Sequence, residues 1–236
     1  MSAYWRYLMK QGHVEANPWH GLTESPGQHL KRAYKFEEIR KFFQSEHVKG
    51  VLRDWMAVAL FTGLRFEDAV QIKAEDLENG GVHIRGGKTE ANIRWVPLSG
   101  PALSVITKRA QGRSGYVFHE VKSGNFNRRS HAISKQFGRV RDKVFGKGAG
   151  ERIDAHSFRR TYAWFGEQVT DAVLLGRLMG HQGETLALRV YSAGAFVERL
   201  KEAQDAISGL IIEKTGADLW EWANDGQQGD EDHVDI

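Results

Sequence analysis

The chain has 236 residues, of which 41% are hydrophobic and only four are proline, so it can form one large or two small globular domains and is not disordered. It contains no cysteine, which excludes disulfides and thiolate metal sites and fits a reducing cytoplasm. No apolar run approaches the roughly 20 residues that a membrane span requires, and the N-terminus lacks a signal-peptide core. We therefore expect a cytoplasmic protein outside the membrane.

The net charge of +3 is unevenly distributed along the chain. Residues 216–236 contain seven acidic side chains and no Lys or Arg, so the other 215 residues carry +10. A basic body with an acidic tail indicates a polyanionic partner, with the tail as a competitor for the basic face. A solubilising tail on an ordinary surface would give the same distribution, and charge alone does not separate the two interpretations.

Residues 1–25 begin with the helix-like spacing of Tyr4, Tyr7 and Leu8 and then pass through Asn17-Pro18 into a linker. From Lys35 onward, apolar residues recur at spacings of three and four. The stretch 51–63 is apolar enough to be a central helix that ends at Thr62-Gly63.

Arg65 follows this central helix directly, and helical spacing resumes after it, so its guanidinium lies at a junction of two packed elements. A purely structural role remains the alternative, in which Arg65 caps a helix or pairs with Glu67 or Asp68.

Residues 80–98 form the clearest β segment of the chain. Apolar and polar residues alternate in 82–85 and again in 93–95, and the glycines between these runs predict a hairpin turn. Lys88 lies near the predicted tip. A lysine at a tip is most often a solvated charge, yet such a tip can also bring an ammonium group into a site.

After a short helix predicted for residues 101–110, a loop leads into a long basic helix. Its basic side chains, with those just before and after it, are Arg128, Arg129, Lys135, Arg139, Arg141, Lys143 and Lys147. Apolar residues alternate with them, so one face packs while the other is positive, as suits a phosphate backbone. A solvated surface is the alternative for any such run.

The stretch from His156 to Tyr191 is the most informative. His156 and Arg159 are three residues apart in a helix-compatible run and can reach one anionic group from one face. His181 follows an apolar run that ends in Gly180, a residue suited to a helix C-terminus. Further on, residues 196–210 predict an amphipathic helix that packs on this body or on a neighbour.

Six side chains outline the chemistry: Arg65, Lys88, His156, Arg159, His181 and Tyr191. They include no carboxylate cluster of the metal-ligand type, so we expect neither a metal nor another cofactor. Two guanidiniums can bind a phosphodiester bidentately and stabilise a pentacoordinate transition state. A phenol becomes a nucleophile when cations and an imidazole help to remove its proton, and a lysine can protonate the leaving alkoxide.

Five stretches occur in order across roughly residues 36–200: FTGLRFEDAVQIKAEDL, GGKTEANIRWVPLS, DAHSFRRTYA, LLGRLMGH and LRVY. Together they resemble the catalytic domain of the tyrosine recombinases, or phage integrases. The resemblance implies an α+β fold, mainly α-helical, with a small antiparallel β-sheet or hairpin. It also implies a core-binding-domain remnant and linker at 1–25, a catalytic domain at 26–215 and an acidic tail at 216–236, which we expect to be disordered unless Trp220 and Trp222 dock.

The same resemblance assigns a role to each candidate residue. Arg65 and Arg159 would bind the scissile phosphate, with Asp68 orienting the first arginine. His156 would accept a proton or a hydrogen bond, and His181 would contact the phosphate. Tyr191 would attack to give a 3′-phosphotyrosyl linkage, and Lys88 would protonate the 5′ oxygen.

The implied partner is double-stranded DNA, contacted by Arg128, Arg129, Lys135 and Arg139. The implied assembly is a homotetramer on DNA and a monomer without it, with an accessory DNA-bending protein as a further partner in phage or mobile-element integration. Because only part of a core-binding domain is present, we expect weak, salt-sensitive DNA binding with retained cleavage. Type IB topoisomerase-like relaxation and a non-catalytic DNA-binding regulator remain the alternatives.

Overall fold

The computed structural model describes residues 2–18, 31–85, 93–122, 129–180 and 195–224. The chain divides into two compact units, residues 1–30 and residues 31–236. The described part of the first unit contains the helix α1 (Ser2–Lys10), on which Tyr4 and Tyr7 are exposed.

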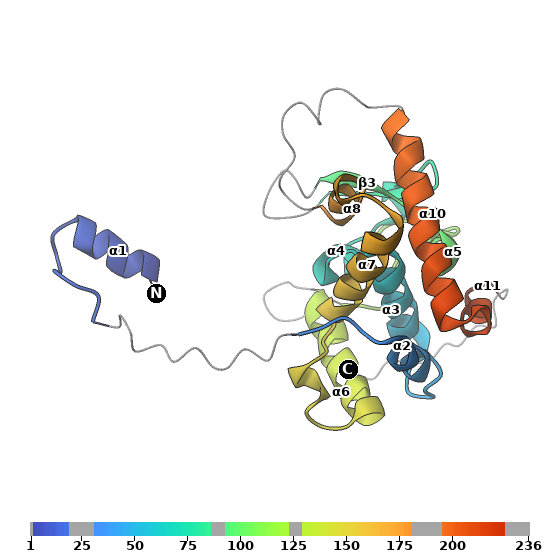
Figure 1. The fold of residues 1–236 in the computed structure, drawn as a ribbon, viewed down its shortest axis with the longest axis horizontal. Coiled ribbons are helices and arrows are strands. Elements are labelled where there is room, and N and C mark those ends of the chain that lie inside the picture. The colour runs from blue at the N-terminus through green and yellow to red at the C-terminus, as the bar shows by residue number, and fades with distance from the viewer. Residues whose placement is uncertain (1, 19–30, 86–92, 123–128, 181–194, 225–236) are drawn as a thin grey trace. The chain divides into compact units, whose positions relative to one another are not determined.

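The described part of the second unit is mainly helical and contains a small sheet (Figure 1). In chain order its elements are α2 (Phe36–Phe43), α3 (Gly50–Thr62), α4 (Phe66–Val70), η1 (Ala74–Asp76), β1 (Leu77–Glu78), β2 (Gly81–Ile84), β3 (Arg94–Pro97), α5 (Gly100–Ala110), α6 (Ser130–Phe145), η4 (Ala149–Glu151), α7 (His156–Val169), α8 (Ala172–Met179), α10 (Ala195–Thr215), η5 (Ala217–Trp220) and α11 (Glu221–Asn224). This confirms the predicted fold class.

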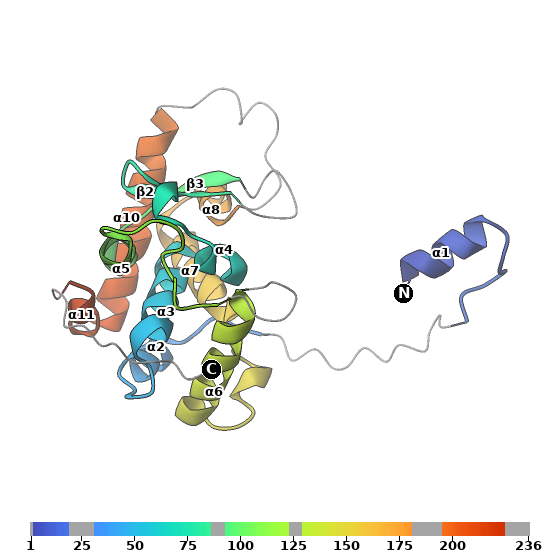
Figure 2. The ribbon, with the colours of Figure 1, turned by 180° about the vertical axis from the view of Figure 1, so that it is seen from behind.

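Helix α3 is the centre of the core, because it is apolar on nearly every face. It packs against α5 and α7, and α10 lies along α7 (Figures 1 and 2). Trp55, Phe61 and Leu60 of α3 are all completely buried. The helix ends at Gly63, whose φ of 60° is the left-handed conformation that a glycine adopts at low cost.

The sheet has three antiparallel strands in the order β1-β2-β3. Val82 pairs with Val96 and Ile84 pairs with Arg94, so the predicted pairing of the two runs is confirmed. The strand β1 was not predicted, because two residues are too few to show an alternating pattern. The predicted hairpin tip, including Lys88, lies outside the described residues.

Helix α10 packs on its own chain through α7 and α8. Its Gln204 is completely buried, and its side-chain amide donates to the Phe61 carbonyl at 2.6 Å while its carbonyl oxygen accepts from the Tyr162 hydroxyl at 2.7 Å. Because buried polar groups need partners, these two bonds fix the register of α10 against α3 and α7.

The two tryptophans after α10 pack against other helices of the second unit. The sequence predicts order in this segment only if they do so. Trp220 is 3% exposed and donates its indole N–H to Thr215 at 2.8 Å. Its ring packs edge-on against Phe61, and the Trp222 ring lies under the guanidinium of Arg53. Residues 225–236 lie outside the described part of the chain.

Across the described residues, no helix combines the length and the apolar character that a membrane crossing requires. In the same ranges, no three His, Asp or Glu side chains gather in a way that could hold a metal ion.

Candidate active site

Three arginines meet at the C-terminal end of α8, and we call Arg65, Arg94 and Arg159 the arginine cluster. Each donates to a different one of three successive carbonyls: Arg94 Nε to Leu178 O at 3.1 Å, Arg159 Nη2 to Met179 O at 2.6 Å and Arg65 Nη2 to Gly180 O at 3.1 Å. The last carbonyls of a helix have no intrahelical partner and form the negative end of its dipole. Guanidiniums therefore bind there favourably.

The three arginines come from separate parts of the sequence. Arg65 is the residue before α4, Arg94 begins β3, and Arg159 lies one turn into α7. In Figures 1 and 2, β3 and α8 lie at the same end of the second unit, while α6 lies at the other. The fold thus brings a helix junction, a strand and a helix N-terminus to one point.

Arg159 also connects α8 to the central helix. Its Nη1 donates to the carbonyl of Gly63 at 2.7 Å, so one buried guanidinium joins the C-terminal ends of α3 and α8. A Cβ at Gly63 would lie 2.3 Å from the Tyr162 ring, which is why no larger residue fits. Arg159 is only 4% exposed, so its position is set by protein contacts on several sides.

Asp68 is the acidic member of the site. It is 9% exposed and its Oδ2 lies 3.8 Å from Nη1 of Arg65, which agrees with the predicted pairing of these two residues. Burial raises the pKa of Asp68, while the positive charges of Arg94, Arg65 and Arg159 oppose that rise. One carboxylate therefore balances part of the charge of the whole arginine cluster.

Burial also changes the pKa of two of the three arginines. It lowers the pKa of Arg94 to about 10 and that of Arg159 to about 10, and neighbouring positive charges add to the lowering. Both groups remain protonated at neutral pH, since that lies about three units lower. With Asp68 ionised, the three guanidiniums and one carboxylate sum to +2.

His156 is the first residue of α7 and is exposed. Its pKa is lowered, first by partial loss of hydration and then by the positive charges of Arg160 and Arg159. At neutral pH the imidazole is therefore mainly uncharged and can accept a proton or a hydrogen bond. The sequence placed His156 and Arg159 on one helix face, and the structure places both in the first turn of α7.

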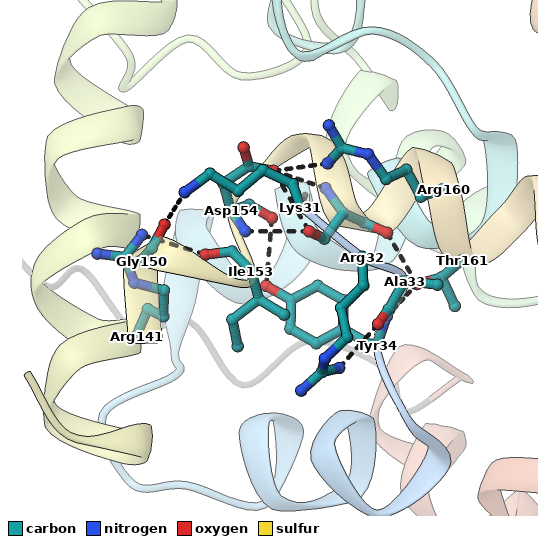
Figure 3. Close-up of polar contacts among 11 residues, drawn as sticks. Lys31, Arg32, Ala33, Tyr34, Arg141, Gly150, Ile153, Asp154, Arg160 and Thr161 are labelled. Carbon is teal, nitrogen blue, oxygen red and sulfur yellow. Dashed lines mark hydrogen bonds and ion pairs between the residues drawn. The ribbon is translucent and has the colours of Figure 1, made fainter. Parts of the chain in front are cut away.

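The start of α7 is held by hydrogen bonds from several segments (Figure 3). Asp154 Oδ1 accepts from the backbone N–H of Ser157 at 3.0 Å and from Nη1 of Arg160 at 3.1 Å. From the beginning of the second unit, the backbone N–H of Tyr34 donates to Thr161 Oγ1 at 2.8 Å, and the Tyr34 hydroxyl donates to the Asp154 carbonyl at 3.3 Å. These bonds fix the helix turn that carries His156.

The residues before Tyr34 extend this attachment toward α6 and η4. Lys31 Nζ donates to the Gly150 carbonyl (Figure 3). The backbone N–H of Arg32 donates to the Arg152 carbonyl at 2.9 Å. The Arg32 guanidinium makes a bidentate pair with Glu38 at 2.6 and 2.7 Å. Residues 31–34 therefore connect the N-terminal ends of α2 and α7.

Three of the six candidates, Lys88, His181 and Tyr191, lie outside the described residues, as does Arg128. Of the other three, Arg65 and Arg159 meet at the end of α8, with Asp68 beside Arg65, whereas His156 lies exposed at the start of the helix that carries Arg159. His181 follows Gly180 directly in the sequence, and Arg65 of the arginine cluster binds the Gly180 carbonyl. The cluster therefore fixes the residue just before His181.

The four predicted DNA contacts do not share one environment. Lys135 and Arg139 are exposed on α6, four residues apart on one face, and Lys143 continues that face. Arg129 instead is 8% exposed, donates to the Phe118 carbonyl at 2.6 Å and lies 3.8 Å from the Tyr116 ring centre. Arg129 therefore does not belong to the basic face, because its guanidinium is buried against the protein.

Sequence reasoning missed Arg94. The alternation of β3 assigns it to the polar face of a hairpin, where an arginine is usually solvated. No pattern within the strand indicates that this face meets the end of α8, where Leu178 is 84 residues away in the chain. The role of Arg94 is visible only in the structure, through its hydrogen bond to the Leu178 carbonyl.

The model of the phage integrase family matches residues 32–196. This match covers more than half of the chain and includes every member of the site described above. The chain belongs to the phage integrase family.

Individual relatives agree with this assignment. The integrase of Enterobacteria phage 434 is 24% identical over 194 residues, which are 79% of this chain and 54% of the relative. This chain thus spans about half the length of that curated integrase.

Solved structures share the fold. The integrase from mycobacterium phage Brujita matches with a TM-score of 0.59 at 19% identity, over 91% of this chain and 74% of the other. A lambda integrase tetramer bound to a Holliday junction matches with a TM-score of 0.57 at 22% identity, over 77% and 56%. The Tn1549 transposon integrase in complex with a circular intermediate DNA gives 0.59 at 16% identity, over 84% and 76%.

Proposed function

We propose that this protein is a site-specific DNA recombinase that cleaves and rejoins DNA strands through a 3′-phosphotyrosyl intermediate. The observation that carries the proposal is the convergence of the arginine cluster with Asp68 at the C-terminal end of α8. A fixed group of guanidiniums with a net positive charge suits an anion with several oxygens. Membership of the phage integrase family makes a DNA phosphodiester the favoured anion.

Arg65 and Arg159 are proposed to bind the non-bridging oxygens of the scissile phosphate. A guanidinium has five N–H donors, and two of those of Arg159 bind the carbonyls of Gly63 and Met179, so we assign the phosphate contacts to its other donors. Arg65 has the more accessible side chain, at 38% exposed. Donors that are already in place need little reorganisation as the charge on the phosphate grows in the transition state.

Tyr191 is proposed as the nucleophile. Its phenolic oxygen forms a bond to phosphorus as the bond to the 5′ oxygen breaks, and the released oxygen takes a proton from Lys88. His156 accepts the phenolic proton or a hydrogen bond, and His181 contacts the phosphate. The products are a 3′-phosphotyrosyl ester and a free 5′ hydroxyl. Attack by a 5′ hydroxyl on that ester reverses the reaction without ATP.

The exposed face of α6, formed by Lys135, Arg139 and Lys143, is proposed to contact DNA phosphates, together with Arg128. Side chains of this kind lie in solvent, so their attraction for DNA falls steeply with salt. Their role would be affinity and orientation rather than bond making.

The organisation of the protein is proposed to follow its family. Residues 1–25 would be the end of a core-binding domain with a linker, residues 26–215 the catalytic domain and residues 216–236 an acidic tail. The protein would act in the cytoplasm as a homotetramer on DNA and as a monomer without it, helped by an accessory DNA-bending protein in phage or mobile-element integration. The lambda integrase tetramer on a Holliday junction supports the assembly.

The test is a covalent trap. A duplex carrying the recognition site and a nick next to the scissile phosphate loses its short leaving fragment after cleavage, so the phosphotyrosyl complex accumulates. We expect the wild-type protein to become covalently attached to DNA, Tyr191→Phe to lose this product completely, and Tyr4→Phe to keep it, because Tyr4 is an exposed residue of α1.

Two results would contradict the proposal. If the protein binds DNA but no covalent product forms on any site, the result favours a DNA-binding regulator with the same fold. If the protein instead relaxes supercoiled plasmid without dependence on a site, it is a topoisomerase of the type IB kind.

A further inference from the structure

We infer that Arg94 is a positioning residue of this active site, which joins the hairpin that carries Lys88 to the helix end that precedes His181. This inference rests on the proposed function. The observation behind it is a contact between β3 and α8, each of which leads directly into a proposed catalytic residue.

The contact is specific. Arg94 is half-buried at the start of β3, two residues after the segment 86–92, and its Nε donates to the Leu178 carbonyl at 3.1 Å. The base of the hairpin is thereby attached to α8 two residues before Gly180. A carbonyl at a helix C-terminus accepts a guanidinium donor better than a neutral one, because the helix dipole adds to the hydrogen bond.

The turn that ends α8 is shaped around Arg94. Gly180 has a φ of 67°, and a Cβ built on it would lie 2.5 Å from Nη1 of Arg94. The guanidinium thus lies directly against the backbone of Gly180. Any residue with a side chain at this position would push Arg94 away, and loss of Arg94 would leave the turn without support on that side.

Arg94 also shares the charge of Asp68. Among the groups that oppose the rise in the pKa of Asp68, Arg94 has the largest effect, followed by Arg65 and Arg159, while Glu67 acts in the opposite direction. Without Arg94, Asp68 would depend on Arg65 and Arg159 for balance. These are the two residues proposed to bind phosphate, so Arg94 keeps them available for the substrate.

Two consequences follow for a variant without this guanidinium. Cleavage slows because the chain leading to His181 and the base of the hairpin are less well placed, and a misplacement of about 1 Å can cost on the order of 100-fold. In addition, the pKa of Asp68 rises further, so activity falls off at a higher pH on the acid side. A residue that only stabilised the fold would cause neither a change in this pH dependence nor a rate loss in fully folded protein.

The experiment measures covalent complex formation at saturating nicked duplex, across pH, for wild type, Arg94→Ala, Arg94→Lys and Arg113→Ala. Arg113 is an exposed arginine after α5 and is the matched control. For Arg94→Ala we expect a rate about 10- to 100-fold lower, an acid limb at higher pH and DNA affinity within about twofold of wild type. Arg94→Lys keeps the positive charge, so its acid limb should return toward that of wild type.

The inference is overturned if Arg94→Ala keeps the wild-type rate and pH profile, or if its rate falls only in proportion to its folded fraction. Should the alanine variant fail to fold, Arg94→Lys and Arg94→Gln supply the same comparison of charged and neutral side chains. If even the wild type forms no covalent complex, the proposed function is wrong. In that case the contact itself is tested by amide hydrogen exchange at residues 177–180. The exchange rate must be higher in Arg94→Gln than in Arg113→Ala.

Discussion

The arginine cluster at the end of α8 and the outer face of α6 both present positive charge, but they hold it differently. In the cluster, backbone carbonyls fix the guanidiniums, and burial lowers the pKa of Arg94 and Arg159 to about 10. On α6, Lys135 and Arg139 are exposed to solvent.

The difference indicates a division of labour. Fixed, partly dehydrated charges act strongly on a nearby anion and need no reorganisation, whereas exposed charges are screened and mobile. We expect the first kind to control the rate of bond breaking and the second kind to control affinity for DNA.

The largest expected effect is at Arg159. Replacing it by alanine removes donors to two helix ends and to the proposed phosphate, so the cleavage rate should fall by about 10²- to 10³-fold. The matched change on α6, Arg139→Ala, should leave the rate at saturating DNA within about twofold. If the two variants show similar cleavage rates in a single-turnover assay, then the arginine cluster does not control the rate separately from the α6 face.

A smaller effect is expected from pH. His156 must be uncharged to accept a proton. Its pKa lies below the ordinary histidine value of about 6.5, so the imidazole is mainly neutral at every pH above that lowered pKa. The rate should therefore be level near neutral pH and fall about tenfold per unit only at pH values below that lowered pKa.

The control for this profile is another exposed histidine. The variant His156→Gln should lose the part of the acid limb that protonation of His156 causes and keep only the part that protonation of Asp68 causes. The variant His47→Gln, altered far along the chain from α7, should keep both parts. An acid limb centred above the ordinary histidine pKa in the wild type would show that partial burial and the charges of Arg160 and Arg159 do not lower the pKa of His156.

The smallest effect is expected on α6. The double change Lys135→Ala and Arg139→Ala should weaken DNA binding several-fold and reduce the slope of log affinity against log salt by about two, one for each lost phosphate contact. Binding titrations at several salt concentrations measure both quantities. An unchanged slope would mean that this face does not contact DNA.

Much of this site follows from local sequence, and the rest does not. Arg65 could be placed because the break at Gly63 and the renewed helical spacing fix a helix junction on either side of it. The pairing of β2 with β3 followed from alternation and glycines. These signals are local, and local signals survive in a single sequence.

The parts that failed depend on distant contacts. Arg94 looks like a solvated strand residue until α8 is placed beside it, and Arg129 looks like a member of a basic surface until Tyr116 and the Phe118 carbonyl enclose it. An arginine carries both a charge and an apolar stem, so the sequence alone cannot say which environment it occupies.

The most direct test of the central claim, that the cluster acts on the charge of a phosphate, combines Arg159→Ala with a neutral phosphodiester. A methylphosphonate at the scissile position replaces one charged oxygen by a methyl group. If Arg159 acts on that charge, the 10²- to 10³-fold penalty of Arg159→Ala on normal DNA should shrink to about tenfold or less on the neutral substrate. An equal penalty on both substrates would contradict the claim.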